Sequence, residues 1–204
     1  MPTASLSVDL KQFYSQTTQL NSLIPSLNNL SADHRKLVAE IMMVRLFLMV
    51  ENTIQSACGK LLCGAPYLDT TTPLLLVLAR SSVDAFDLMR NHGRTKAKRS
   101  LNWTQSSEIR DNLRYTMDQN DSIFQAISNY GTLLTDMRYI RNHIAHKSSG
   151  SLENFQKLIR KHYGGLKRGV TPGLLLLTQA LGPPVLIEQY ILSSRVMIKS
   201  LVRG

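Results

Sequence analysis

Apolar residues recur at helical spacing along almost the whole chain, and this pattern limits the possible folds more than any other feature of the sequence. No segment shows sustained alternation of apolar and polar residues, and glycine-marked hairpins are missing. We therefore expect an all-α protein, a bundle of four to six helices with additional helices at the C-terminal end. With 204 residues, the chain is long enough for one domain with its own core and an appended helical piece.

Prolines, glycines and polar clusters divide the chain into the expected helices. Ser31 is the expected N-cap of a helix that is apolar on nearly all sides from Ile41 to Val50, as is typical of a central bundle helix. Pro73 is the expected first residue of another helix, because proline is tolerated there. The Asn120-Asp121 pair is a potential break in a third. The predicted helices cover residues 7–24, 32–62, 73–91, 107–129, 131–147 and 151–163, a short helix after Thr171-Pro172, and a last helix ending near 202.

The chain is strongly basic, with 24 lysines and arginines against 14 acidic residues and a net charge of +10. This balance favours polyanionic partners such as nucleic acid. The basic segment 90–99 is either a solvated loop or an RNA-binding element. Apolar stretches are too short to span a bilayer, and no secretory signal is recognisable, so we expect a cytoplasmic protein without membrane contact. Cys58 and Cys63 are interpreted as two buried thiols, and no metal or other cofactor is predicted.

The segment 138–147, Arg-Tyr-Ile-Arg-Asn-His-Ile-Ala-His-Lys, carries the most informative pattern in the sequence. At about 100° per residue, Asn142 and His146 share one helix face, away from the apolar stripe, and Arg138 lies near it. Arg141 lies at the edge of the stripe, about 140° from His146. Two side chains this far apart around one continuous helix do not easily converge on one phosphate. Either the helix therefore ends around His146, or a second copy of the chain completes the site.

An arginine and asparagine followed three residues later by histidine, at the end of a helix in an all-α chain, resemble the signature of the HEPN superfamily. The sequence Arg141-Asn142-His143-Ile144-Ala145-His146 is most similar to the RiboL-PSP-HEPN group of toxin and defence ribonucleases. The resemblance covers the helical layout from about residue 30 to 165, although only the six-residue motif is a sharp match. It implies an HEPN-like domain at 1–165, with 166–204 as a helical extension packed on that domain or on a dimer partner.

The resemblance implies a metal-independent RNA endonuclease in which the ribose 2′-hydroxyl attacks phosphorus and leaves a 2′,3′-cyclic phosphate. Arg141, Asn142 and His146 are the expected catalytic residues. An imidazole moves protons near neutral pH, and a guanidinium holds phosphate oxygens. Arg138 and Lys147 are the expected RNA-binding residues. Glu51 is a supporting candidate that would pair with Arg141. The expected partners are RNA, a second copy that completes the active site, and an antitoxin protein.

Other interpretations of the same residues remain open. Ser148 stands where some HEPN toxins carry a tyrosine modified by a partner nucleotidyltransferase, so neutralisation by that route is doubtful. His146 and Lys147 also fit a simple helix end, where cations interact favourably with the helix dipole. The alternatives at the level of function are a non-catalytic HEPN-like module that binds nucleotides or a protein, and a helical nucleic-acid-binding regulator.

Overall fold

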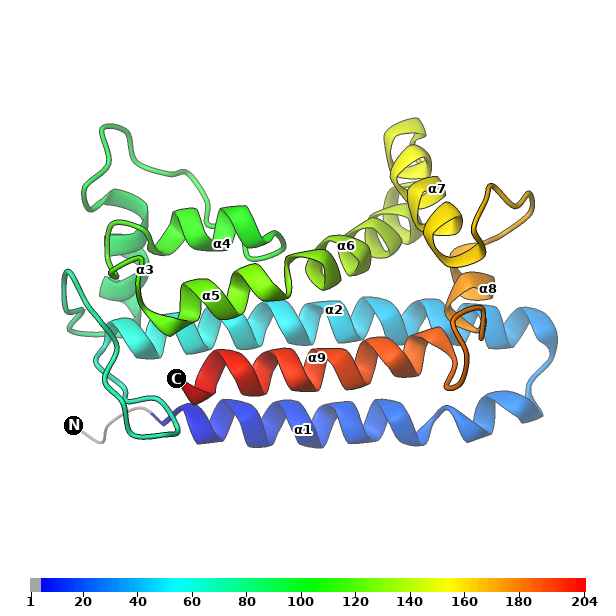
Figure 1. Cartoon of the computed structure of the whole chain (residues 1–204), viewed down its shortest axis with the longest axis horizontal. Coiled ribbons are helices and arrows are strands. Elements are labelled where there is room, and N and C mark those ends of the chain that lie inside the picture. The colour runs from blue at the N-terminus through cyan, green and yellow to red at the C-terminus, as the bar shows by residue number, and fades with distance from the viewer. Residues whose placement is uncertain (1–4) are drawn as a thin grey trace.

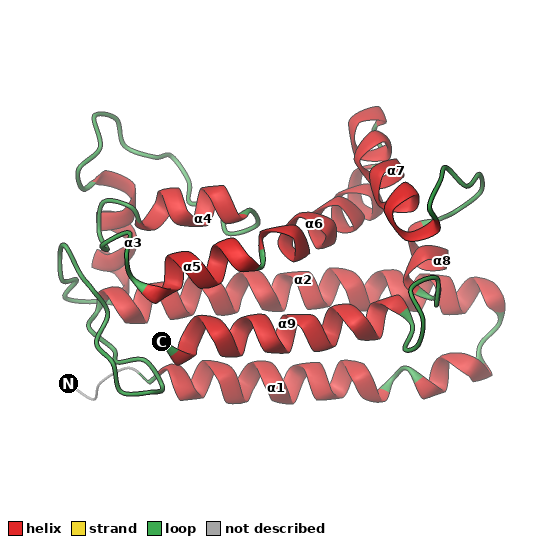
Figure 2. Cartoon of the chain, in the orientation of Figure 1, coloured by secondary structure: helices red, strands yellow, loops and turns green. Residues whose placement is uncertain are grey.

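A computed structural model of the chain describes residues 5–204 and is all-helical, as the periodicity predicted. The first four residues of the predicted domain 1–165 lie outside this range. Nine α-helices and one 3-10 helix make up the secondary structure of the described residues, which contain no strand (Figure 2). The α-helices are α1 (Leu6–Ser22), α2 (Ala32–Leu62), α3 (Ser82–Asn91), α4 (Ser106–Leu113), α5 (Ser122–Asn129), α6 (Gly131–His146), α7 (Ser149–Tyr163), α8 (Pro172–Leu176) and α9 (Leu186–Arg203).

Helix α2 is the central element of the bundle, and it spans most of the length of the molecule (Figure 1). Its 31 residues pack against α1, α6, α8 and α9. The helix begins as the sequence predicted, because the Ser31 side chain accepts a hydrogen bond from the backbone N–H of His34. Burial on several sides explains why its middle is almost continuously apolar.

The C-terminal segment 166–204 packs on the rest of its own chain. Helix α9 runs beside both α1 and α2, and α8 lies against the N-terminal part of α2 (Figure 1). Backbone N–H groups of Leu68 and Asp69 donate to the carbonyls of Val202 and Arg203, at 3.0 and 3.1 Å. The end of α9 is thereby held against the loop that follows α2.

The prediction of a helix beginning at Pro73 is wrong, because residues 73–81 are irregular and α3 begins only at Ser82. Tertiary contacts keep this segment from forming a helix. Leu75 forms an isolated bridge with Met117, and the buried Asp121 carboxylate accepts hydrogen bonds from the Leu74 N–H at 2.7 Å and from the Tyr67 hydroxyl. These partners outweigh the local preference of Pro73 for a first helical position.

The single helix expected at 107–129 is two helices, α4 and α5. The break falls between Arg114 and Asp121, and Asp121 caps α5 by accepting a hydrogen bond from the Ile123 N–H at 3.0 Å. The Asn120-Asp121 pair therefore marked the break correctly. The carboxylate of Asp121 both caps α5 and accepts a hydrogen bond from the irregular segment 73–81.

Helix α8 approaches α2 so closely that one glycine has no room for a side chain. A β-carbon on Gly173 would lie 2.4 Å from the backbone oxygen of Lys36, and the Gly173 N–H donates to Glu40 Oε1 at 2.9 Å. We expect Gly173→Ala to lower the free energy of unfolding by about 2 kcal/mol, because overpacking against backbone is not relieved by a rotamer change. Thermal unfolding followed by circular dichroism measures this. A matched control, Gly165→Ala, has open space around it and should change little; equal effects of the two substitutions would contradict the contact.

No helix within residues 5–204 is both long and apolar enough to cross a membrane.

Candidate functional site

Helix α6 ends at the last residue of the motif, as the sequence predicted. Lys147 follows His146 with a left-handed backbone (φ 45°), and this conformation turns the chain away from the helix axis. Ser148 then caps α7, its hydroxyl accepting a hydrogen bond from the Ser151 N–H at 3.3 Å. The short turn brings the first residues of α7 beside the end of α6.

Asn142 and His146 line one pocket between the end of α6 and the start of α7. Their common face is the one that their four-residue spacing predicted. The pocket has a volume of about 270 Å³, and the exposed imidazole of His146 lies at the surface. The N-terminal turn of α7 adds backbone N–H groups, which favour anions. The residues that line the pocket are Tyr139, Asn142, His146, Ser148, Gly150, Ser151 and Asn154.

Arg141 faces α2 instead of this pocket. Its guanidinium lies 5.9 Å from the centre of the Phe47 ring, and its Nη1 donates a hydrogen bond to Asn142 Oδ1 at 3.1 Å. Asn142 therefore contacts Arg141 while it lines the pocket of His146. Within one chain, Asn142 contacts the guanidinium and lines the same pocket as the imidazole, whereas Arg141 is not part of that pocket's lining.

Glu51 is half-buried on α2, in the electrostatic field of Arg141. Burial raises the pKa of the Glu51 carboxyl, and the positive charge of Arg141 opposes that rise. The two side chains form no ion pair in the described part of the chain. Glu51 and Arg141 therefore interact as nearby charges, without the direct ion pair that was predicted.

The two predicted RNA-binding residues, Arg138 and Lys147, are next to pocket residues in sequence but are not part of the pocket lining. Arg138 is half-buried one helical turn before Asn142, and Lys147 is exposed at the end of α6.

His143, to which the sequence assigned no role, holds α7 against α6. Its ring stacks on Phe155 with centroids 4.8 Å apart, and its Nδ1 is hydrogen-bonded to Ser151 Oγ at 3.2 Å. Burial lowers the pKa of His143, Lys147 lowers it further, and Glu40 acts in the opposite direction. The sequence also missed Tyr139 and Asn154 as pocket residues. The available signal was the Ser-x-x-Ser pattern at 148–151, which predicts a helix start immediately after the motif.

The packing of α7 also buries a histidine without hydrogen-bond partners. Both ring nitrogens of His162 and the hydroxyl of Tyr190 are buried and unpaired among the described residues. Burial lowers the pKa of His162 from its usual value near 6.5; Asp136 raises it, and Lys161 lowers it. Since the unfolded chain binds this proton more readily, the contribution of His162 to stability is complete above pH 6.5 and declines as the pH falls below it.

We therefore expect the free energy of unfolding to drop between pH 7.5 and 5.5, and His162→Leu to reduce that drop. Urea unfolding at the two pH values measures the difference. His92→Leu, which changes an exposed histidine directly after α3, is the matched control for replacing an imidazole with leucine. A pH dependence that is the same in His162→Leu as in the wild type would show that this ring titrates like a solvent-exposed histidine.

Some cations of the basic segment 90–99 form ion pairs within the protein. Arg94 is 7% exposed and donates to Asp111 at 3.2 Å, and Lys98 lies 2.6 Å from the same carboxylate. Burial works to raise the pKa of Asp111, but the hydrogen bond from Lys98 and the nearby charges hold it below its usual range. Of the four cations in 94–99, only Lys96 and Arg99 are exposed for RNA.

An exposed apolar strip on α2 borders the motif. Leu37, Ile41 and Leu48 are 53%, 57% and 43% exposed, and together with Val44 they repeat at intervals of four, three and four residues. Ile144 of α6 joins this strip, three residues after Arg141. Arg45 is exposed beside the strip.

Among the described residues, no three His, Cys, Asp or Glu side chains are placed to hold a metal ion together. No protein-family model matches the chain, and comparisons with curated proteins and with solved structures find no significant similarity. The site is therefore defined by its own geometry: an Arg-Asn-His constellation at a helix end, next to a helix N-terminus and an apolar strip.

Proposed function

We propose that this protein is a metal-independent RNA endonuclease of the HEPN toxin or defence type, acting as a homodimer. The observation that carries the proposal is the link Arg141–Asn142–His146, in which one amide binds the guanidinium and lines the pocket of the imidazole. These groups supply what RNA cleavage by transesterification needs, which is a proton carrier and a fixed positive charge.

In the proposed reaction, the ribose 2′-oxygen attacks the adjacent phosphorus and loses its proton to a base. The bond from phosphorus to the 5′-oxygen of the next nucleotide breaks, and that oxygen takes up a proton. The products are a 2′,3′-cyclic phosphate and a free 5′-hydroxyl. His146 is the proposed general base or general acid, Arg141 stabilises the charge that builds on the phosphoryl oxygens, and Asn142 positions both. Arg138 and Lys147 bind flanking phosphates.

The apolar strip supports pairing of two copies. A contiguous exposed apolar surface at heptad spacing suits a helix of a second copy. On α6, Arg141 and His146 are about 7.5 Å apart along the helix axis, and Ile144 of the strip lies between them. A two-fold axis that passes near Ile144 and is perpendicular to α6 would set the partner's α6 antiparallel. Arg141 of one copy then lies level with the His146 of its partner.

The experiment that tests the function is incubation of purified protein with single-stranded RNA in excess EDTA. We expect cleavage products that carry 2′,3′-cyclic phosphate ends, detected by resistance to labelling at the 3′ end until the cyclic phosphate is opened and removed. An absence of cleavage over a wide range of RNA sequences and salt concentrations would contradict the proposal. It would leave the non-catalytic nucleotide- or protein-binding module as the alternative.

A further inference from the structure

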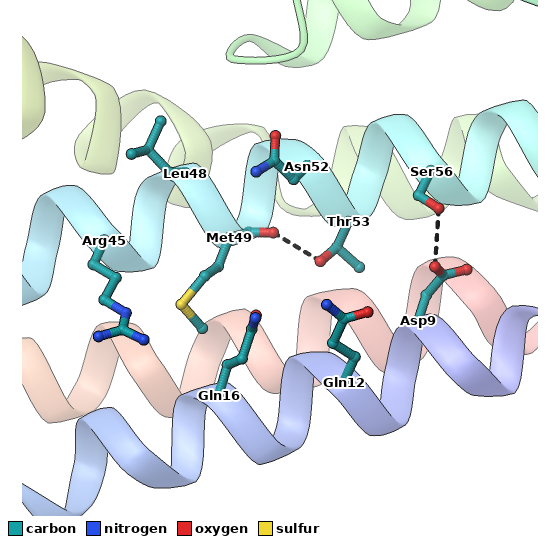
Figure 3. Close-up of a pocket in the computed structure, with 9 residues that line it drawn as sticks. All are labelled: Asp9, Gln12, Gln16, Arg45, Leu48, Met49, Asn52, Thr53 and Ser56. Atoms are coloured by element: carbon teal, nitrogen blue, oxygen red, sulfur yellow. Dashed lines mark hydrogen bonds between the residues drawn. The ribbon is translucent and has the colours of Figure 1, made fainter. Parts of the chain in front are cut away.

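A second cavity lies between α1 and α2, on the side of α2 that faces away from α6. It has a volume of about 310 Å³ and is open to the surface. Figure 3 shows side chains from both helices converging on this groove. Arg45 and Leu48 line both the groove and the apolar strip, so that the two surfaces adjoin along α2. The groove is lined by Asp9, Gln12, Gln16, Arg45, Leu48, Met49, Asn52, Thr53 and Ser56.

Three amide side chains in the groove have their hydrogen-bonding groups uncommitted. Gln12 and Gln16 are one turn apart on α1 and point toward α2, while Asn52 lies at the rim of the groove, on the side of α2 away from α1 (Figure 3). Within residues 5–204, none of these amides forms a side-chain hydrogen bond. Each amide offers both a donor pair and an acceptor, so the set can match a ligand edge that carries mixed donors and acceptors.

The charges in the groove are separated along its length. At one end, the Asp9 carboxylate is neutralised by Lys60 at 2.8 Å and by the Ser56 hydroxyl at 2.9 Å. At the other end, Arg45 is exposed and has no carboxylate partner in the described part of the chain. The groove therefore favours a ligand with one anionic end.

We propose that this groove binds a nucleotide, with the phosphate at Arg45 and the base edge at the amides. Guanidinium groups bind phosphate through paired N–H donors, and asparagine and glutamine are the side chains that pair with base edges. Leu48 and Met49 supply apolar contact for the flat face of the base. Arg45 and Asn52 are two turns apart, about 10.5 Å along the helix, which leaves room for phosphate, sugar and base in sequence.

The same chemistry is offered by a free nucleotide and by one nucleotide of an RNA strand, and the experiment separates them. The four ribonucleoside 5′-monophosphates are titrated calorimetrically. Four fluorescent single-stranded DNA homopolymers, which lack the 2′-hydroxyl and are not cleaved by the proposed chemistry, are titrated by anisotropy. Binding of a monophosphate identifies a site for free nucleotides, whereas binding of the homopolymers alone identifies a site for a strand.

In either case, we expect the double variant Gln12→Ala/Gln16→Ala to weaken binding of the probe that carries the preferred base by about tenfold, which is the scale of one base-edge pairing. Arg45→Ala should weaken binding of the probes with all four bases by the same factor and reduce the salt dependence of binding. Gln19→Ala on α1 and Arg80→Ala are exposed controls outside the groove. Failure of every probe to bind, or equal affinities for groove variants and controls, would overturn the proposal. This inference goes beyond the proposed function, because the readout is binding and the substituted residues lie outside the motif, so its outcome does not depend on whether cleavage at the motif is refuted.

Discussion

Replacing His146 or Arg141 with alanine is expected to reduce RNA cleavage by about a thousandfold, the range found for a general acid–base group or a charge-stabilising donor. His146 is exposed, and Arg141 contacts only Asn142 and the Phe47 ring among the interactions that the structure records for it, so neither change should unfold the bundle. Cleavage rates, with circular dichroism to verify folding, measure the effect. In cells, growth arrest on expression should be relieved by His146→Ala if the protein is a toxin.

The controls for this experiment are His92→Ala and Arg80→Ala, which change exposed residues of the same types in other parts of the chain. Both should cleave RNA like the wild type. If His146→Ala and Arg141→Ala also cleave at the wild-type rate, the activity does not come from the motif. The dipole interaction at the end of α6 is then sufficient to explain His146.

Disrupting the apolar strip should abolish both pairing and cleavage. Ile41→Glu places a carboxylate in the middle of the strip, at a side chain that is 57% exposed in the monomer, so the fold should tolerate it. A paired strip would have to bury that charge, so we expect the dimer dissociation constant to rise by about a hundredfold, for a cost of several kcal/mol. Analytical ultracentrifugation and cleavage assays at the same concentrations measure both effects.

Val83→Glu is the matched control, because Val83 is an exposed apolar residue on α3, outside the strip. It should change neither mass nor activity. A monomeric Ile41→Glu variant with full cleavage activity would show that each chain carries a complete site. A wild-type protein that is monomeric at all accessible concentrations would refute the pairing itself.

Mixing inactive variants tests whether the site is shared between copies. In a heterodimer of Arg141→Ala and His146→Ala, one of the two composite sites keeps both groups, so an equilibrated equal mixture should recover about a quarter of the wild-type activity. A site within one chain would recover nothing on mixing. This outcome separates the two arrangements without any structure of the dimer.

The sequence by itself determined the helical class, the start of α2 at Ser31 and the end of α6 at His146. These features depend on local chemistry: periodicity, capping and turn residues act within a few positions along the chain. For the same reason, the shared face of Asn142 and His146 follows from their spacing alone. The nuclease chemistry stays a prediction that rests on the resemblance of the motif.

Only the tertiary structure decided which local preferences were overridden and which charges were already paired. Asp121 binds the non-helical segment 73–81 despite Pro73, and Asp111 binds two of the cations in the basic segment. Arg141 faces Phe47 on α2 while His146 faces the start of α7, because each is placed by a different neighbouring helix. Such contacts join residues far apart in sequence, and their energies depend on burial and partners that no local pattern encodes.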